Sequence, residues 1–119
     1  KQLKKGLDQL LEEGAVQIFY KPGIGDMEPI LGAVGVLQFE VLTHRLKQEY
    51  GVDVILDRLP YELARWLDGD FDTKAFGKYG GSLLVEDRDG NATVLFRDEW
   101  SLNWEIEKNP SVRFLDYAP

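Results

Sequence analysis

Apolar residues at helical spacing open the chain. Four leucines fall at i, i+4, i+7 and i+8, the stripe of an amphipathic helix: Leu3, Leu7, Leu10 and Leu11. Gly14 stands where a residue with positive φ would end this helix. The apolar segment 15–20 and residues 28–32 are separated by the Pro- and Gly-containing segment 21–25, so a β-hairpin is predicted next.

A second helical pattern begins at residue 34. Its main apolar positions lie at i, i+3, i+7 and i+11: Phe39, Leu42, Leu46 and Tyr50. Leu37 and Val41 are predicted to widen this buried face, and Gly51 to end the helix. Residues 52–56 alternate and then become continuously apolar, which predicts a third strand in the centre of a sheet.

The second half of the chain contains more strand signals. Four segments are predicted to be strands: 61–67, 82–86, 92–96 and 112–115. Asp89 and Gly90 separate the second and third of them and form a strong hairpin signal, with Gly90 at positive φ. A short helix is predicted over residues 73–78, with Asp72 as its N-cap.

A last helix is predicted between the third and fourth of these strands. Asp98 or Ser101 can cap its start, and Asn109, which precedes a proline, stops it. Trp100 and Trp104 share one face of this helix at i, i+4. We expect both to pack in the core or at its edge, in preference to forming a platform for base stacking.

The order of these elements predicts an α+β fold. Residues 1–57 read α-β-β-α-β, and residues 58–119 read β-α-β-β-α-β, which is the split βαβ or ferredoxin-like plan. The first half follows the same plan without its opening strand. We therefore expect an antiparallel sheet with helices mainly on one face, built as two submodules of a single domain. The start at Lys1, already inside a helical pattern, predicts a C-terminal piece of a larger factor.

Composition narrows the chemistry. The chain has no cysteine and a single histidine, His44, which excludes disulfides, thiol catalysis and multi-histidine metal sites. His44 is expected at the surface of the second helix. The net charge of −7 divides into 6 − 9 = −3 for residues 1–57 and 8 − 12 = −4 for residues 58–119, so neither half resembles a basic nucleic-acid-binding arm. No run approaches the ~20 apolar residues of a membrane span, so no membrane partner is expected.

A phosphate-binding loop is missing from the sequence. The Gly77-Lys78 pair is followed by Tyr79, and Asp72 occupies the position where the first glycine of such a loop is needed. We therefore predict a non-catalytic domain without a cofactor of its own.

The acidic turn over residues 87–91 is predicted to be structural. If Gly90 were position six of a calcium loop, Val85 and Phe96 would stand at positions one and twelve, and neither side chain can ligate calcium. The aspartates of residues 68–72 lack ligands at a known spacing and are interpreted as a solvated loop. No metal site is expected.

The most specific pattern is the glycine-containing segment 32–40, which continues directly into the helix over residues 41–51. Further matching segments are 5–17, 61–67 and 109–114. Together they resemble the C-terminal domain, domain III, of the bacterial peptide chain release factor 3 family. A more distant similarity runs to domain III of elongation factor G, where Gln38 takes the place of a histidine.

This resemblance implies a part in translation termination. Members of that family are cytoplasmic GTPases that bind GTP or GDP with magnesium in an upstream domain. They recycle the codon-reading release factors from the ribosome after peptide release. The resemblance implies that this domain contacts the small-subunit shoulder protein and ribosomal RNA, and that it couples to the upstream GTPase and barrel domains.

Because the chain is acidic, we expect a few isolated cations to contact the ribosome. The candidates are Arg45 and Lys47 on the long helix and Lys74 and Lys78 on the short one. Two alternatives remain open on sequence grounds. One is a ferredoxin-like regulatory domain that binds a small effector. The other is the equivalent domain of an elongation-factor-like ribosomal protection protein.

Overall fold

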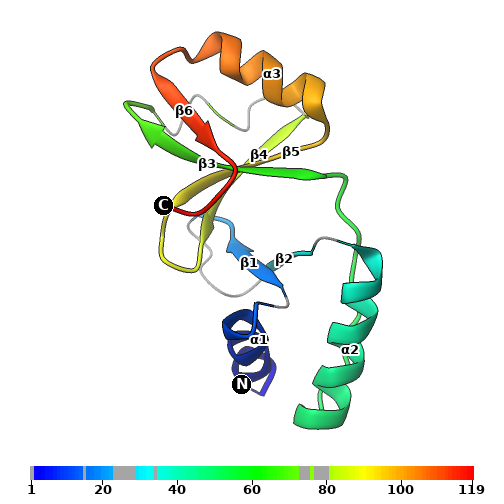
Figure 1. Ribbon diagram of the computed structural model, residues 1–119. Coiled ribbons are helices and arrows are strands. Elements are labelled where there is room, and N and C mark those ends of the chain that lie inside the picture. Colours follow the sequence, from blue (N-terminus) through cyan, green and yellow to red (C-terminus); the bar gives the residue numbers. More distant parts are fainter. Residues whose placement is uncertain (1, 15, 23–28, 34, 73–75, 77–80) are drawn as a thin grey trace. The chain divides into compact units, whose positions relative to one another are not determined.

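The computed structural model describes residues 2–14, 16–22, 29–33, 35–72, 76 and 81–119 (Figure 1). The chain divides into two compact units, one comprising Lys1–Phe19 and Pro29–Arg58, the other Tyr20–Glu28 and Leu59–Pro119. The prediction of two submodules that meet at residue 57 stays a prediction.

The first unit is built on two helices and a hairpin. Its elements are α1 (Gln2–Glu12), β1 (Gln17–Tyr20), β2 (Ile30–Gly32) and α2 (Val36–Tyr50). β1 and β2 are antiparallel, with Ile18 opposite Leu31, which confirms the predicted hairpin. Gly14 and Gly51 have φ values of 77° and 67°, as predicted for residues that end helices.

A glycine lets the two helices approach each other closely. A Cβ at Gly6 of α1 would lie 2.6 Å from Leu46 Cδ2 and 3.0 Å from Tyr50 Cδ2, both on α2. Leu7 and Leu10 of α1 are buried, and Leu46 is only 1% exposed. The leucine stripes predicted from the sequence therefore form the core of the first unit.

α2 buries fewer apolar side chains than the sequence predicts. Leu42 and Leu46 are buried, whereas Leu37 is 69% exposed and Val41 is 51% exposed. The prediction that Leu37 and Val41 widen the buried face is therefore wrong. Successive residues of a helix are about 100° apart, so Val41 points about 100° and Leu37 about 140° away from Leu42.

The strand predicted at residues 52–56 is also wrong. Residues 52–59 contain neither helix nor strand, and Ile55 is 93% exposed. A β-branched run fits a pleated and half-buried surface, but it becomes a strand only where a neighbouring strand is present to pair with it. Residues 52–59 have no such partner within the described ranges.

The second unit contains a four-stranded antiparallel sheet. Its strands are β3 (Leu63–Gly69), β4 (Ser82–Asp87), β5 (Ala92–Phe96) and β6 (Val112–Leu115), in the spatial order β4-β5-β3-β6. β5 lies between β3 and β4 and is antiparallel to both, which confirms the predicted split βαβ arrangement and the α+β class. The short helix predicted at residues 73–78 lies outside the described residues, apart from Phe76.

One helix and the sheet enclose the core of the second unit. α3 (Glu99–Lys108) contributes Leu102 to a buried cluster, whose members are Leu67, Phe76, Val94, Phe96, Leu102 and Val112. The ring of Phe114 on β6 lies 6.1 Å from that of Phe76 and 6.2 Å from that of Phe96, measured between centroids. β5 is buried continuously from Thr93 to Phe96.

Candidate functional site

Arg45 on α2 is held by two carboxylates. Its Nη1 donates to Glu13 Oε1 and its Nε donates to Glu49 Oε2, each at 2.7 Å. The bond to Glu49 and then the bond to Glu13 raise the pKa of Arg45. The bonds from Arg45 lower the pKa of both glutamates. The guanidinium therefore ties α2 to the end of α1, and its charge is already compensated within the unit.

Lys47 is the more accessible of the two candidates on α2. Its Nζ lies 3.6 Å from Asp53 Oδ1, and both side chains are largely exposed. Lys74 and Lys78 lie outside the described residues. Ribosome contact through Arg45, Lys47, Lys74 and Lys78 stays a prediction.

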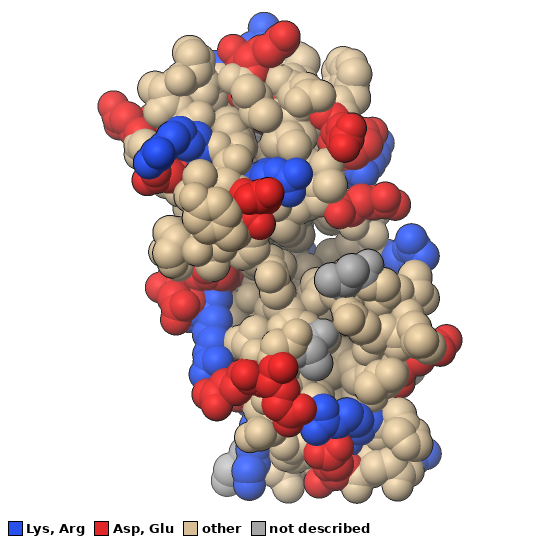
Figure 2. All heavy atoms as spheres, viewed as in Figure 1, with Lys and Arg blue, Asp and Glu red and all other residues tan. Residues whose placement is uncertain are grey.

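Charges of both signs are interspersed on the surface. Figure 2 shows Lys and Arg side chains next to Asp and Glu, without a continuous basic field on the face that it displays. His44 is exposed on α2, which confirms its predicted surface position. This pattern agrees with the net charge of −7 and does not resemble the basic stripe of a nucleic-acid-binding surface.

The start of α2 carries exposed apolar side chains. Val36 is 63% exposed, and the exposed Leu37 and Val41 lie on the first turns of the same helix. We refer to Val36, Leu37 and Val41 as the α2 apolar surface. Several large apolar side chains exposed on one short stretch are typical of a contact with another protein surface.

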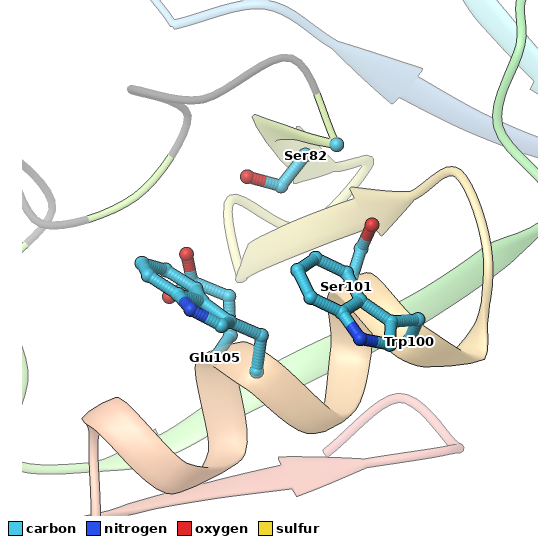
Figure 3. A pocket seen from close by; sticks show the side chains of 6 residues that line it. Ser82, Trp100, Ser101 and Glu105 are labelled. Carbon is cyan, nitrogen blue, oxygen red and sulfur yellow. The ribbon is translucent and has the colours of Figure 1, made fainter.

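A pocket of about 260 Å³ lies between α3 and the beginning of β4. It is lined by Gly81, Ser82, Trp100, Ser101, Trp104 and Glu105. Figure 3 shows Ser82 on the β4 side and Trp100, Ser101 and Glu105 on α3. The α3 residues come to one side because they are spaced at i, i+1, i+4 and i+5.

Capping fixes the start of α3 beside the pocket. Asp98 Oδ1 accepts a hydrogen bond from the Ser101 backbone N–H at 2.8 Å, which confirms the predicted N-cap. This bond lowers the pKa of Asp98. The helix ends at Asn109, whose backbone N–H donates to Glu105 O at 3.0 Å.

Glu105 is a buried carboxyl group at the edge of the pocket. Its side chain is 3% exposed, and Asn109 Nδ2 donates to Oε2 at 3.0 Å. Burial raises the pKa of Glu105, and the hydrogen bond from Asn109 offsets part of that effect. Ser82, across the pocket, is 6% exposed. Two polar side chains that are more than nine-tenths buried therefore line the same pocket.

The two tryptophans of α3 differ in exposure. Trp104 is half-buried, with Lys108 Nζ 5.6 Å from its ring centroid. Trp100 is 73% exposed, so the prediction that both residues pack in or at the edge of the core is wrong for Trp100. Trp100 lies in the first turn of α3, and Leu102 is the apolar residue that this helix directs into the core.

Asp87 organises the hairpin between β4 and β5. Its Oδ1 accepts hydrogen bonds from the backbone N–H groups of Asp89 and Asn91, at 2.9 and 2.8 Å. Its Oδ2 accepts hydrogen bonds from Trp66 Nε1 and Asn91 Nδ2, each at 3.0 Å. Partial burial raises the pKa of Asp87, but these hydrogen bonds together have a larger and opposite effect, so the pKa is lowered overall. Gly90 has a φ of 85°, as predicted for this turn.

The carboxylate oxygens of Asp87 are thus engaged within the turn. Over the described ranges, no three His, Asp or Glu side chains gather closely enough to hold a metal ion. In the same part of the chain, no helix is long and apolar enough to cross a membrane.

Sequence reasoning missed the pocket, although part of its signal was present. Trp100 and Trp104 are spaced at i, i+4, and Glu105 follows directly after Trp104. An acidic residue on a helix is usually solvated, and the burial of Glu105 depends on how α3 meets β4 and the chain after the helix. That arrangement is a tertiary feature.

Comparison with known proteins identifies the family. The family described as "Class II release factor RF3, C-terminal domain" matches residues 1–106. A "Peptide chain release factor 3" of Symbiobacterium thermophilum is 52% identical over 116 residues, which are 96% of this chain and 22% of that protein. The protein of that name from Nostoc punctiforme is 43% identical over 120 residues, covering 100% of this chain and 22% of the relative.

A third relative of the same name, from Gloeobacter violaceus, is 41% identical over 121 residues, which cover 100% of this chain and 23% of that protein. The chain thus spans less than a quarter of the length of these curated relatives. The predicted resemblance is confirmed: the chain belongs to the family of C-terminal domains of class II release factor 3.

Proposed function

We propose that this domain is the non-catalytic docking and coupling part of a translation termination factor. The factor is a cytoplasmic GTPase that recycles codon-reading release factors from the ribosome after peptide release. The observation that carries this proposal is the family match over residues 1–106. Proteins named peptide chain release factor 3, which are 41 to 52% identical over 116 to 121 residues, support it.

The nucleotide chemistry is assigned to another part of the factor. The chain lacks the sequence of a phosphate-binding loop. More than three quarters of the length of the relatives lies outside the matched segment, which leaves ample room for other domains. We place GTP or GDP with magnesium in an upstream domain, and this domain supplies contacts to the small-subunit shoulder protein and to ribosomal RNA.

Coupling to the upstream GTPase and barrel domains is supported by the α2 apolar surface. Val36, Leu37 and Val41 expose apolar area that water solvates poorly. Contact with another domain of the same factor would remove this area from water. The mixed charges around Lys47 suit the more polar contacts that a transient ribosome complex uses.

The full-length factor, compared with and without the segment that corresponds to residues 1–119, tests the proposal. The shortened factor is expected to bind guanine nucleotide but to lose ribosome-stimulated GTP hydrolysis or release-factor recycling. Normal recycling by the shortened factor would exclude the coupling role. GTP hydrolysis by the isolated domain would exclude the non-catalytic assignment.

A point variant separates coupling from folding. Leu37→Ser in the full-length factor is expected to leave nucleotide binding intact and to reduce ribosome-stimulated hydrolysis. Tyr117→Ser is the matched control, because Tyr117 is a similarly exposed apolar side chain in the second unit. Equal effects of the two variants would argue against a specific role of the α2 apolar surface.

The family match also bears on the two alternatives. It favours a release factor over a small-effector-binding regulatory domain, and over the equivalent domain of a ribosomal protection protein.

A further inference from the structure

The pocket between α3 and β4 is lined by two largely buried residues, Ser82 and Glu105, each with an oxygen that has no hydrogen-bond partner among the described residues. Glu105 Oε2 accepts from Asn109 Nδ2, whereas Oε1 has no hydrogen-bond partner among the described residues. The Ser82 hydroxyl likewise has no partner in this part of the chain. Among the described residues, no fully buried side-chain nitrogen or oxygen lacks a partner. Oε1 and the Ser82 hydroxyl must therefore be accessible to solvent. Because both residues line the pocket, we infer that these two oxygens face its interior.

The negative charge around the pocket indicates the charge of the ligand that it can bind. α3 carries three glutamates and one lysine, which gives 1 − 3 = −2 for the helix, and the chain as a whole carries −7. The helix N-terminus, which would otherwise attract an anion, is already capped by Asp98. Burial raises the pKa of Glu105, and a cation close to Oε1 would favour the ionised form of this carboxyl group. The pocket thus favours a cationic group.

The aromatic walls favour a flat cation. Trp100 and Trp104 line the pocket, and Lys108 Nζ already lies 5.6 Å from the Trp104 ring centroid. A guanidinium group stacks on an indole face and presents five N–H donors in one plane, whereas an ammonium group is compact and more strongly hydrated. The carboxylate Oε1 and the Ser82 hydroxyl can both accept from such donors.

The size of the pocket indicates a single side chain. Sites for drug-sized ligands enclose about 300–1,000 Å³, and this pocket encloses about 260 Å³. Trp100 is mostly exposed, so a side chain can enter from the protein surface.

From these observations we propose that the pocket formed by Ser82, Trp100, Trp104 and Glu105 binds an arginine side chain of a basic protein segment. The guanidinium stacks on an indole ring, donates to Glu105 Oε1 and donates to the Ser82 hydroxyl. Trp100 is the residue that the incoming side chain covers. This site is independent of the α2 apolar surface.

NMR titration of the 119-residue chain tests this inference. The probe is a capped Gly-Arg-Gly peptide, followed through the indole N–H signals of the three tryptophans. The signals of Trp100 and Trp104 should shift with a dissociation constant of about 1 mM, in the range of weak single-residue recognition. Trp66, whose Nε1 donates to Asp87, is the internal reference and should not shift.

Three further probes define what is recognised. The citrulline peptide has the shape of arginine without its charge, and it should bind about tenfold more weakly, since its neutral donors lack the ionic attraction to the Glu105 carboxylate. The lysine peptide should also bind more weakly than the arginine peptide. Cytidine monophosphate tests for a nucleobase, and binding tighter than that of the arginine peptide would overturn the proposal in favour of RNA.

Two variants connect the binding to the pocket. Glu105→Gln keeps the shape of the side chain and should weaken arginine binding about tenfold. Glu107→Gln removes the same charge from an exposed position on the same helix and should change binding less than about twofold, because solvent screens exposed charges. Trp100→Ala removes an exposed side chain, so the fold is retained while binding is lost.

Circular dichroism of each variant verifies that it is folded. The inference is wrong if the arginine peptide at 10 mM, about ten times the expected dissociation constant, shifts neither indole signal. It is also wrong if citrulline binds as well as arginine, or if the two glutamate variants behave alike.

Discussion

The two units of the chain use their apolar residues differently. In the second unit the sheet and α3 enclose a cluster of six buried residues, and β5 is buried over four consecutive positions. In the first unit α1 and α2 pack closely at Gly6, but the start of α2 leaves Val36, Leu37 and Val41 in solvent. Both units thus have a buried core, and the first unit also presents an apolar surface at the start of α2.

This difference has a consequence for how the two units act. An exposed apolar helix face gains free energy from almost any complementary apolar surface, so it suits a permanent contact within a larger factor. A small pocket with aromatic walls and a few polar side chains can recognise one chemical group and gain specificity from it. The two proposals accordingly assign coupling to the first unit and recognition to the second.

Leu46→Ala gives the largest expected effect and tests whether the first unit has a core of its own. Leu46 is 1% exposed and lies against Gly6. The substitution should lower the free energy of unfolding by ~2–5 kcal/mol, measured by urea denaturation. Leu37→Ala is the control from the same helix and should change it by less than about 0.5 kcal/mol. Equal effects at the two positions would remove the distinction between buried and presented faces of α2.

Asp87→Ala tests the polar organisation of the second unit. Asp87 accepts hydrogen bonds from Trp66, Asp89 and Asn91. Losing this acceptor should lower the free energy of unfolding by about 1–3 kcal/mol, because the buried Trp66 indole loses its bond to the carboxylate. Asp89→Ala is the matched control, since only the backbone N–H of Asp89 takes part in the turn.

The hydrogen bonds of the Asp87 carboxylate also predict how the stability of the chain depends on pH. The pKa of Asp87 is lowered in the folded chain, so its contribution is present above the unfolded pKa of 3.8 and is lost as the pH falls through the folded pKa. The stability difference between wild type and Asp87→Ala should therefore shrink below about pH 4.

Calorimetric titration with calcium should show no binding in the micromolar range, and saturable heat abolished by Asp87→Ala would contradict the structural role of this carboxylate.

Gly6→Ala tests the close approach of α1 and α2. Alanine favours a helix over glycine by about 1 kcal/mol, but the new Cβ would lie 2.6 Å from Leu46 Cδ2. Overpacking costs about 1–3 kcal/mol, so a net loss of about 1 kcal/mol is expected in urea denaturation. Gly35→Ala is the control, because a Cβ there meets nothing within 4 Å. Stabilisation by Gly6→Ala would show that Leu46 moves aside freely.

Elements with repeating local signals could be predicted from the sequence. The leucine stripe of α1, the turn at Gly90 and the Asp98 cap each depend on residues within a few positions of one another, and the structure confirms all three. The order of β3 to β6 also followed, since few topologies are compatible with β-α-β-β-α-β.

The errors arose where tertiary context decides the outcome. Residues 52–56 have the composition of a strand but no strand to pair with in the part of the chain that the structure describes, and Leu37 has the composition of a core residue but points away from α1. The pocket could not be predicted, because the burial of Glu105 depends on segments that are distant in sequence. Apolar or acidic character alone does not reveal which side a residue faces.

Glu105→Gln gives the smallest expected effect and tests a buried carboxyl group of the second unit. Burial raises the pKa of Glu105 in the folded chain. A carboxyl group with a raised folded pKa contributes stability below the unfolded pKa of 4.5, and this contribution is lost as the pH rises through the folded pKa. Glutamine does not titrate, so the variant should gain stability relative to wild type as the pH rises from 4 to 7. This range begins near the unfolded pKa of a glutamate, about 4.3–4.5. Thermal melts across this range would measure the change, with Glu107→Gln as the exposed control on α3. If the variant instead loses stability relative to wild type as the pH rises, Glu105 is stabilised as the anion by groups within the unit, and the pocket does not need a cation to balance this carboxylate.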